Sequence, residues 1–210
     1  GMTLLMVNNE VENYLDDDQT QRLLDVLRTD ANRNVCHILM FLISTGARLN
    51  EALTATWKNV SVEGGVWKVD AIRSKSKKTR SIPLNGSALW VLEQLGSKGK
   101  SDYLFPSPVK AADGKDAPYL TVTRAWYRLR KLAGVNVRIH DLRHSFASRL
   151  VCNGRSLYEV QQILGHSDPK VTMRYAHLSA KTLQEAANAG SVIVPKVVPK
   201  AETMEAAKAA

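Results

Sequence analysis

The sequence predicts a mainly helical α+β domain with a small three-stranded antiparallel sheet near its start. Apolar residues recur at helical spacing before residue 57 and after residue 121, whereas two-residue alternation is confined to residues 60–84. A chain of 210 residues is long enough to bury a sizeable core in one domain with a tail. No apolar stretch approaches the roughly 20 residues that a membrane-spanning helix needs.

Most of the expected helices carry a start or stop signal. Asp16 to Asp18 place carboxylates where they complement a helix dipole, and Gly46 ends a buried apolar helix. Asn85 and Asp168 are expected to cap helix starts. The predicted helices cover residues 16–27, 34–45, 49–57, 86–96, 121–133, 140–152, 157–164, 169–178 and 181–189.

The sheet is predicted by a hairpin pattern followed by one more strand. Two apolar runs, 60–62 and 66–72, flank the turn Glu63-Gly64-Gly65, which is typical of a hairpin. A basic turn from Arg73 to Arg80 leads into a third strand at 81–84. Trp67, Val69 and Ala71 alternate and are expected to share the buried face of the second strand.

The charge balance favours a polyanionic partner. The chain has 29 basic and 20 acidic residues and a pI near 9.6, and each basic residue placed on a phosphate releases a counterion. Solubility alone is the other explanation of this surplus. Cys36 lies in an apolar run and Cys152 is far from it, so we expect reduced thiols in a cytoplasmic protein.

Two pairs of residues are candidates for chemistry. His140 and Arg143 are three apart on one predicted helix, so they share a face; a guanidinium binds two phosphate oxygens, and an imidazole exchanges a proton near neutral pH. Arg48 follows a helix end, and Glu51 one turn later can orient it. Taken alone, each pair is better explained by an ordinary helix start or by a surface ion pair of little energetic value.

A tyrosine, a histidine and a lysine complete the candidate set. Tyr175 follows His166 on the next predicted helix. A helical tyrosine normally packs; it becomes a nucleophile only where its hydroxyl, with a pKa of about 10, faces a phosphate whose charge is neutralised. Lys75 stands in the basic turn, but spacing alone does not distinguish it from Lys77 and Lys78.

Five segments stand in the order and spacing of the tyrosine recombinase (phage integrase-like) family. They are TGARLNEAL, SKSKKTRSIPL, HDLRHSFAS, LGHSD and VTMRYAHLS. Each motif alone is weak evidence, but five in order over residues 16–185 are specific. The sequence resembles this family, so we expect its catalytic-domain fold over 16–190, after a linker at 1–15 and before a tail at 191–210.

The resemblance implies a role for each motif residue. Tyr175 attacks the DNA phosphate and forms a 3′-phosphotyrosyl bond, His140 takes the tyrosine proton, directly or by buffering charge, and Lys75 protonates the leaving 5′ oxygen. Because a short segment joins the predicted helix of Tyr175 to His166, Tyr175 is expected to be the adjustable member of the site. The catalytic residues that the resemblance implies are Arg48, Lys75, His140, Arg143, His166 and Tyr175.

The remaining motif residues are expected to bind or support the phosphate. The resemblance implies that Arg48 and Arg143 clamp its non-bridging oxygens and that His166 donates to one of them. Glu51 and His144 match supporting positions. No metal, cofactor or ATP is expected, because the arginines fill the electrostatic role of a metal pair. The turn is expected to bind the DNA backbone through Arg73, Lys77, Lys78 and Arg80.

The resemblance also implies partners. These are double-stranded DNA, three further subunits in a homotetramer of the full-length protein on DNA, and accessory DNA-bending proteins; the isolated chain is expected to be monomeric. The tail at 191–210 is a candidate for exchange between subunits, and a tail without such a role is an equal alternative. We expect a bacterial or phage-encoded protein associated with the nucleoid.

Three functions fit these motifs. The first is a site-specific recombinase or integrase, and the second is a type IB-like topoisomerase with the same chemistry but without strand exchange. The third is a non-catalytic DNA-binding module on the same fold. The complete motif set disfavours the third function, and the short motif spacing resembles recombinases more than topoisomerases.

Overall fold

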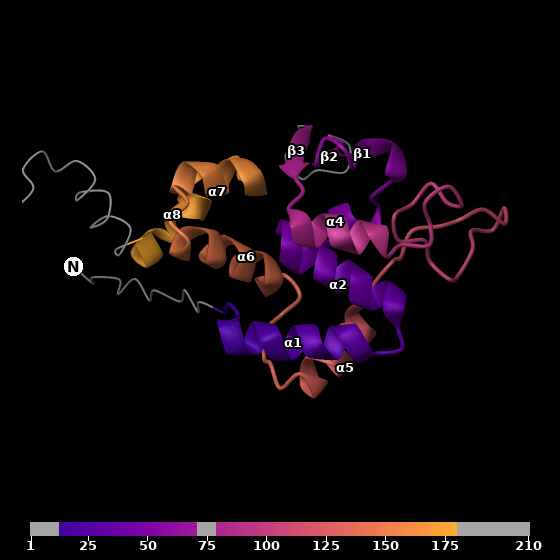
Figure 1. Ribbon diagram of the computed structural model, residues 1–210, viewed down its shortest axis with the longest axis horizontal. Helices are drawn as coiled ribbons and strands as arrows, with labels where there is room; N and C mark the ends of the chain where they lie inside the picture. The colour runs from indigo at the N-terminus through magenta and orange to yellow at the C-terminus, as the bar shows by residue number, and fades with distance from the viewer. Residues whose placement is uncertain (1–12, 71–78, 180–210) are drawn as a thin grey trace, which may run out of the picture.

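The computed structural model describes residues 13–70 and 79–179 (Figure 1). Within these ranges the chain is mainly helical with one three-stranded antiparallel sheet, which confirms the predicted fold class. The helices α1, α2 and α4 lie in successive layers below the sheet, and α6, α7 and α8 gather on the other side of the molecule (Figure 1). None of the described helices is long and apolar enough to cross a membrane.

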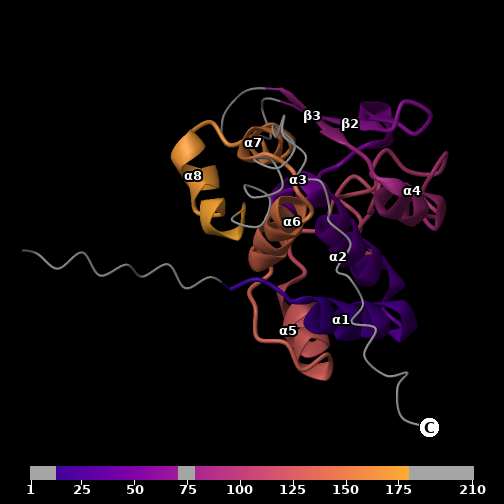
Figure 2. The ribbon, with the colours of Figure 1, turned by 60° about the vertical axis from the view of Figure 1, so that its left-hand side comes forward.

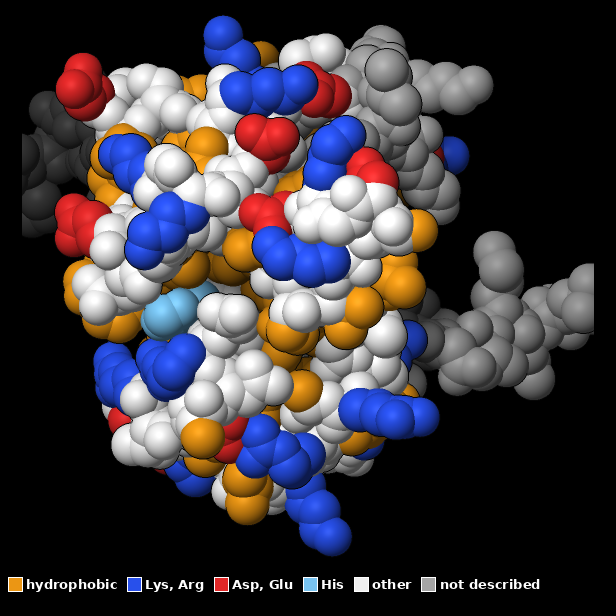
Figure 3. Space-filling view, turned by 90° about the vertical axis from the view of Figure 1, so that its right-hand side faces the viewer, with side chains coloured by type: hydrophobic (Ala, Val, Ile, Leu, Met, Phe, Trp, Pro, Cys, Tyr) orange, Lys and Arg blue, Asp and Glu red, His pale blue; other side chains and the backbone are white. Residues whose placement is uncertain are grey.

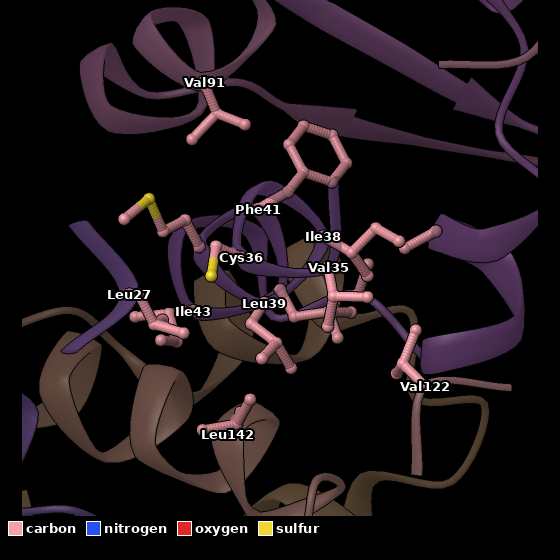
Figure 4. Packing of buried hydrophobic residues seen from close by; sticks show 14 of the residues in the cluster. Leu27, Val35, Cys36, Ile38, Leu39, Phe41, Ile43, Val91, Val122 and Leu142 are labelled. Atoms are coloured by element: carbon pink, nitrogen blue, oxygen red, sulfur yellow. The ribbon is translucent and has the colours of Figure 1, made fainter. Parts of the chain in front are cut away.

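Helix α2 (Arg33–Thr45) is the centre of the packing. Ten of its residues are buried, among them Cys36 and Phe41, and its left-handed C-cap is Gly46, with φ of 62°. Figure 4 shows its apolar side chains between Val91 of α4 (Gly86–Glu93) and Leu142 of α6 (Asp141–Cys152). A helix that is apolar on nearly every side has to be buried between layers in this way.

Helix α1 (Asp17–Thr29) covers one side of α2 and begins at a capping box formed by Asp16 and Gln19. Leu15, which the sequence assigns to the incoming linker, is buried, and its N–H donates to Ser145 Oγ at 2.9 Å. The packed domain therefore includes Leu15. This short extension of the predicted boundary arises from the burial of one side chain and a hydrogen bond to a residue 130 positions away, rather than from a periodic pattern.

Helix α3 (Leu49–Leu53) is shorter than predicted, and a 3-10 turn, η1 (Trp57–Asn59), replaces its expected end. The chain is extended at Thr56, with φ of −124°, and pairs there with Tyr103. Trp57 N–H donates to the carbonyl of Asp102 at 2.9 Å. These bonds to a distant segment cannot be read from local periodicity, and they end the helix early.

The sheet contains β1 (Val60–Ser61), β2 (Val66–Val69) and β3 (Arg80–Pro83) in that order. In the antiparallel register, Trp67 lies opposite Ile82. Trp67 and Val69 are buried as the alternation predicts, and Ala71 lies outside the described residues. The Trp67 ring lies 5.3 Å from the Phe41 ring, so the sheet is fastened to α2 through an aromatic pair.

The C-terminal half is helical, as predicted, with one interruption. It contains α5 (Thr123–Leu132), α6, α7 (Leu157–Leu164), α8 (Pro169–Met173) and the 3-10 turn η3 (Ala176–Ser179). The single helix expected over 169–178 is divided between α8 and η3, and Tyr175 lies between the two. Asp168 caps α8, with Pro169 in its first turn, as predicted. The helix expected at 181–189 lies outside the described residues.

The apolar interior is divided into a large cluster around α2 and a small one around α6 and α7. Tyr175, with 5% of its surface exposed, belongs to the small cluster together with Phe146 and Leu164. Cys36 is buried and unpaired, as predicted, and burial raises the pKa of its thiol to about 11.

Substituting Phe41 by Ala tests whether the sheet depends on α2. Phe41 is 0% exposed and contacts the rings of Trp67 and Phe105. We expect Phe41→Ala to lower the free energy of unfolding by about 3–5 kcal/mol, measured by urea denaturation. Leu120→Ala, at a side chain that is 93% exposed, is the control and should change little. Equal effects of the two substitutions would contradict this account of the core.

Candidate active site

The predicted site residues that the structure describes come from segments that fold together. Arg48 and Glu51 lie at the start of α3, Arg143 lies near the start of α6, and His166 follows α7. Figure 2 shows α3, α6 and α7 next to one another, with β3 close by. Lys75 lies outside the described residues, as do Arg73, Lys77 and Lys78.

Glu51 is a buried carboxylate that holds two arginines. It is 2% exposed; its Oε1 accepts from Arg48 Nη1 at 3.0 Å, and its Oε2 accepts from Arg80 Nη2 at 2.5 Å. The backbone N–H of Arg48 also donates to Oε2, at 2.9 Å, which closes the start of α3. The supporting role implied for Glu51 corresponds to these three contacts.

Arg80 points into the protein, which corrects its expected place among the residues that reach DNA. Its side chain is only 10% exposed and, besides Glu51, donates to the carbonyl of Ile163 at 2.9 Å. The register explains this orientation, because Arg80 is the first residue of β3 and lies opposite Val69. Arg80 therefore joins the base of the hairpin to α3 and to the end of α7.

Arg143 rests on the C-terminal ends of two helices. Its Nη1 donates to the carbonyl of Gly46 at 2.7 Å and its Nη2 to the carbonyl of Leu164 at 2.7 Å. Carbonyls at a helix C-terminus lack intrahelical partners and carry the negative end of the helix dipole, so they suit a guanidinium. Two of its five N–H groups are used in this way.

The arginines give this part of the molecule an excess of positive charge. Arg143 is 4% exposed; burial, followed by the charges of Arg48 and Arg80, lowers its pKa to about 9. Glu51 binds two of these guanidiniums, those of Arg48 and Arg80, and acts on Arg143 only through its charge. An anion is the partner that such a group of charges favours, because it relieves the repulsion among the arginines.

Tyr175 lies against His144 rather than His140. The Nδ1 atom of His144 is 2.5 Å from the hydroxyl oxygen of Tyr175. His140 is exposed, and its ring packs edge-on against the His144 ring at 5.3 Å between centroids. The sequence placed His144 among supporting residues, so the structure gives it a more direct contact with the tyrosine than was expected.

His166 lies on the same side of the site as the arginines. Its Nδ1 is 2.8 Å from Thr172 Oγ1. Burial lowers its pKa to about 3, and Arg143 and Arg48 contribute in the same direction. A neutral imidazole with Nδ1 bonded to a hydroxyl keeps Nε2 for another partner, which agrees with the contact to a phosphate oxygen implied by the motif.

Metal-ligating groups and clusters of basic side chains are two further features that could mark a site. Among the described residues, no group of three His, Cys, Asp or Glu side chains is placed to hold a metal ion. Basic side chains are spread over the face seen in Figure 3, with acidic ones between them in its upper part. The surplus charge is therefore not gathered into one patch on this face.

A model of the phage integrase family matches residues 13–182. The chain belongs to the phage integrase family. The matched region contains every element described above, from α1 to η3. It confirms the family that the five sequence motifs indicated.

Relatives of this integrase-family chain include phage and bacterial proteins. The chain is 34% identical over 173 residues to a putative integrase of Pseudomonas phage Pf1, a match that covers 82% of this chain and 47% of the relative. It is 32% identical over 162 residues to tyrosine recombinase XerD of Vibrio vulnificus, covering 70% of this chain and 50% of the relative. The chain thus spans about half the length of the curated relatives that it matches.

Solved structures share the integrase-family fold. The catalytic domain of bacteriophage HP1 integrase has a TM-score of 0.63 at 26% identity, and the match covers 85% of this chain and 95% of that one. The XerA recombinase has a TM-score of 0.64 at 26% identity, covering 87% of this chain and 64% of that one. The similarity extends over nearly the whole of the HP1 catalytic domain.

Removing the Glu51 carboxylate should destabilise this integrase-family domain. We expect Glu51→Ala to lower the free energy of unfolding by about 3–5 kcal/mol, because it leaves buried guanidiniums without their counter-charge. Urea denaturation measures this change. The matched control is Asp25→Ala, since Asp25 also pairs with an arginine three residues away but is 60% exposed; its loss should be under about 1 kcal/mol. Similar losses for both variants would show that the Glu51 contacts are not a buried ion cluster.

The stability of the domain should fall on acidification before the carboxylates titrate. The pKa of His144 is lowered from 6.5 to about 4 and that of His166 from 6.5 to about 3, chiefly by burial. Below pH 6.5 the unfolded chain therefore binds protons that the folded chain excludes. The free energy of unfolding is unaffected by these histidines above pH 6.5 and decreases as the pH falls toward 4. Urea midpoints measured across this range should decrease with pH, less steeply in His166→Asn. An unchanged slope in that variant would show that His166 does not contribute to the pH dependence of stability.

Proposed function

We propose that this chain is the catalytic part of a site-specific DNA recombinase that cuts and rejoins strands through a 3′-phosphotyrosyl bond at Tyr175. The observation that carries the proposal is the contact of the Tyr175 hydroxyl with a histidine, close to a group of three arginines of which two bind one carboxylate. A nucleophile with a proton acceptor next to an anion-binding group is the arrangement that attack on a phosphodiester requires. Family membership supports the same activity.

The arginines are proposed to bind the phosphate under attack. Negative charge increases on its non-bridging oxygens as the fifth bond to phosphorus forms, and preoriented guanidinium donors stabilise that charge. Arg143 has N–H groups beyond the two that bind Gly46 and Leu164, and Arg48 is the more accessible partner, with 26% of its side chain exposed. His166 is proposed to donate to one of the same oxygens.

Strand exchange is proposed to need no external energy source. Tyr175 forms an ester with the 3′ phosphate while the bond to the 5′ oxygen breaks, so the number of phosphodiester-type bonds is unchanged. The 5′ hydroxyl of a second strand reverses the step. In the family pattern Lys75 protonates the leaving oxygen, and this role remains a prediction for the present chain.

Double-stranded DNA is the proposed substrate. The Tn1549 transposon integrase has been solved in complex with circular intermediate DNA and XerH recombinase bound to its difH substrate, and both share this fold. The formal net charge of +9 supports the same partner. A tetramer of the full-length protein on DNA, exchange of the segment 191–210 between subunits, DNA contacts by Arg73, Lys77 and Lys78, and accessory bending proteins are further proposals.

A nicked suicide substrate tests the nucleophile. The full chain should form a covalent adduct with DNA that denaturing electrophoresis detects, and Tyr175→Phe should form none. Tyr158→Phe, at a tyrosine that is 68% exposed, is the control and should form the adduct. An adduct in Tyr175→Phe would refute the assignment. Paired target sites and a supercoiled plasmid then separate recombination from simple relaxation, which a type IB-like topoisomerase would catalyse.

Replacing Arg143 by Lys tests the phosphate clamp. Lysine keeps the charge but lacks the planar fork that reaches two carbonyls and a phosphate together. We expect the single-turnover cleavage rate of Arg143→Lys to fall about 100-fold or more. Arg128→Lys is the matched control, because Arg128 forms a forked pair with Asp30 on the surface. Equal rates for the two variants would contradict the proposed role of Arg143.

A further inference from the structure

The hydroxyl of Tyr175 meets one imidazole directly. His144 Nδ1 lies 2.5 Å from the phenol oxygen, and the two ring centroids are 6.0 Å apart with an interplanar angle of 46°. Tyr175 is only 5% exposed, so bulk water has little access to the side chain. A base within hydrogen-bond reach of the proton to be removed meets the first requirement of general base catalysis.

His140 stands one ring further from the phenol. It lies one helical turn before His144, and the two imidazoles pack edge-on at 5.3 Å between centroids. Its own side chain is exposed to solvent. The position suits a group that exchanges protons between His144 and water better than one that takes the phenol proton itself.

We infer that His144, rather than His140, accepts the proton of Tyr175 during attack on the DNA phosphate. This inference rests on the proposed function and names a residue for one step of it. The bond between the Tyr175 oxygen and its hydrogen breaks, and a bond from that oxygen to phosphorus forms. The proton moves to His144 Nδ1, whose ring carries its other hydrogen on Nε2. When the strand is rejoined, His144 returns the proton to the leaving phenol oxygen.

The groups around His144 keep its imidazole neutral before attack. Besides Tyr175, it faces His140 and Asp141 on α6, Arg138 before the helix, Arg174 after α8, and His166. Only Asp141 among these favours the imidazolium, and burial together with the cations lowers the pKa of His144 to about 4. The ring is therefore neutral at pH 7 with a free lone pair, and the same surroundings make it a weaker base than free imidazole. A bound phosphate adds negative charge nearby and makes the transient imidazolium less unfavourable.

Two asparagine variants separate the histidines. Asn places an oxygen close to the position of Nδ1, so His144→Asn keeps an acceptor for the phenol but cannot take its proton. Single-turnover cleavage of the suicide substrate is measured between pH 5.5 and 9 for the full chain, His144→Asn and His140→Asn. We expect the rate of His144→Asn at pH 7 to fall by about 100-fold or more and then to increase with pH, because hydroxide must remove the proton. His140→Asn should keep the pH dependence of the unsubstituted chain.

Chemical rescue provides a readout that a structural role of His144 would not produce. In His144→Ala, added imidazole should restore cleavage in proportion to its neutral form, whereas His140→Ala should not respond. A hydroxide-dependent rate in His140→Asn together with an unchanged profile in His144→Asn would overturn the inference and identify His140 as the acceptor. If the unsubstituted chain forms no adduct, the proposed function itself fails; if both asparagine variants cleave normally, only this inference fails.

Discussion

The site depends on one buried carboxylate shared between two arginines. Glu51 neutralises only part of the charge that Arg48, Arg80 and Arg143 bring into the interior. Burying a charge without a partner destabilises the folded state. One carboxylate offsets part of this cost, and the group of side chains keeps a net positive charge. That charge makes the site selective for an anion.

The rest of the compensation comes from helix ends. Arg143 donates hydrogen bonds to the carbonyls of Gly46 and Leu164, and Arg80 donates one to the carbonyl of Ile163. Two glycines make this geometry available: a methyl group at Gly46 would collide with Phe146 and Leu164, and one at Gly165 would collide with Arg80. Both glycines also adopt left-handed conformations, with φ of 62° and 65°. The absence of a side chain at these two motif glycines therefore allows the helix ends to lie close to the guanidiniums.

Local patterns account for most of the fold and for only part of the site. Caps, glycine stops and alternation located α2, β2 and α8 because each depends on neighbouring residues. The inward turn of Arg80 depends on strand register and on a carboxylate 29 residues away, and the pairing of Tyr175 with His144 joins residues 31 apart. Sequence motifs identified these residues as members of one site, whereas their contacts required the folded chain.

Tyr175 and Arg143 depend on the same packing unit, which links their positions. Tyr175 belongs to the small cluster of α6 and α7 with Phe146 and Leu164, and those two side chains lie against Gly46, whose carbonyl holds Arg143. A shift of α7 would move the Leu164 carbonyl away from Arg143 and disturb the packing around Tyr175 together. Among the described residues, this small cluster has far fewer buried members than the core around α2, so Tyr175 lies in the part of the interior where a rearrangement disturbs the fewest apolar contacts.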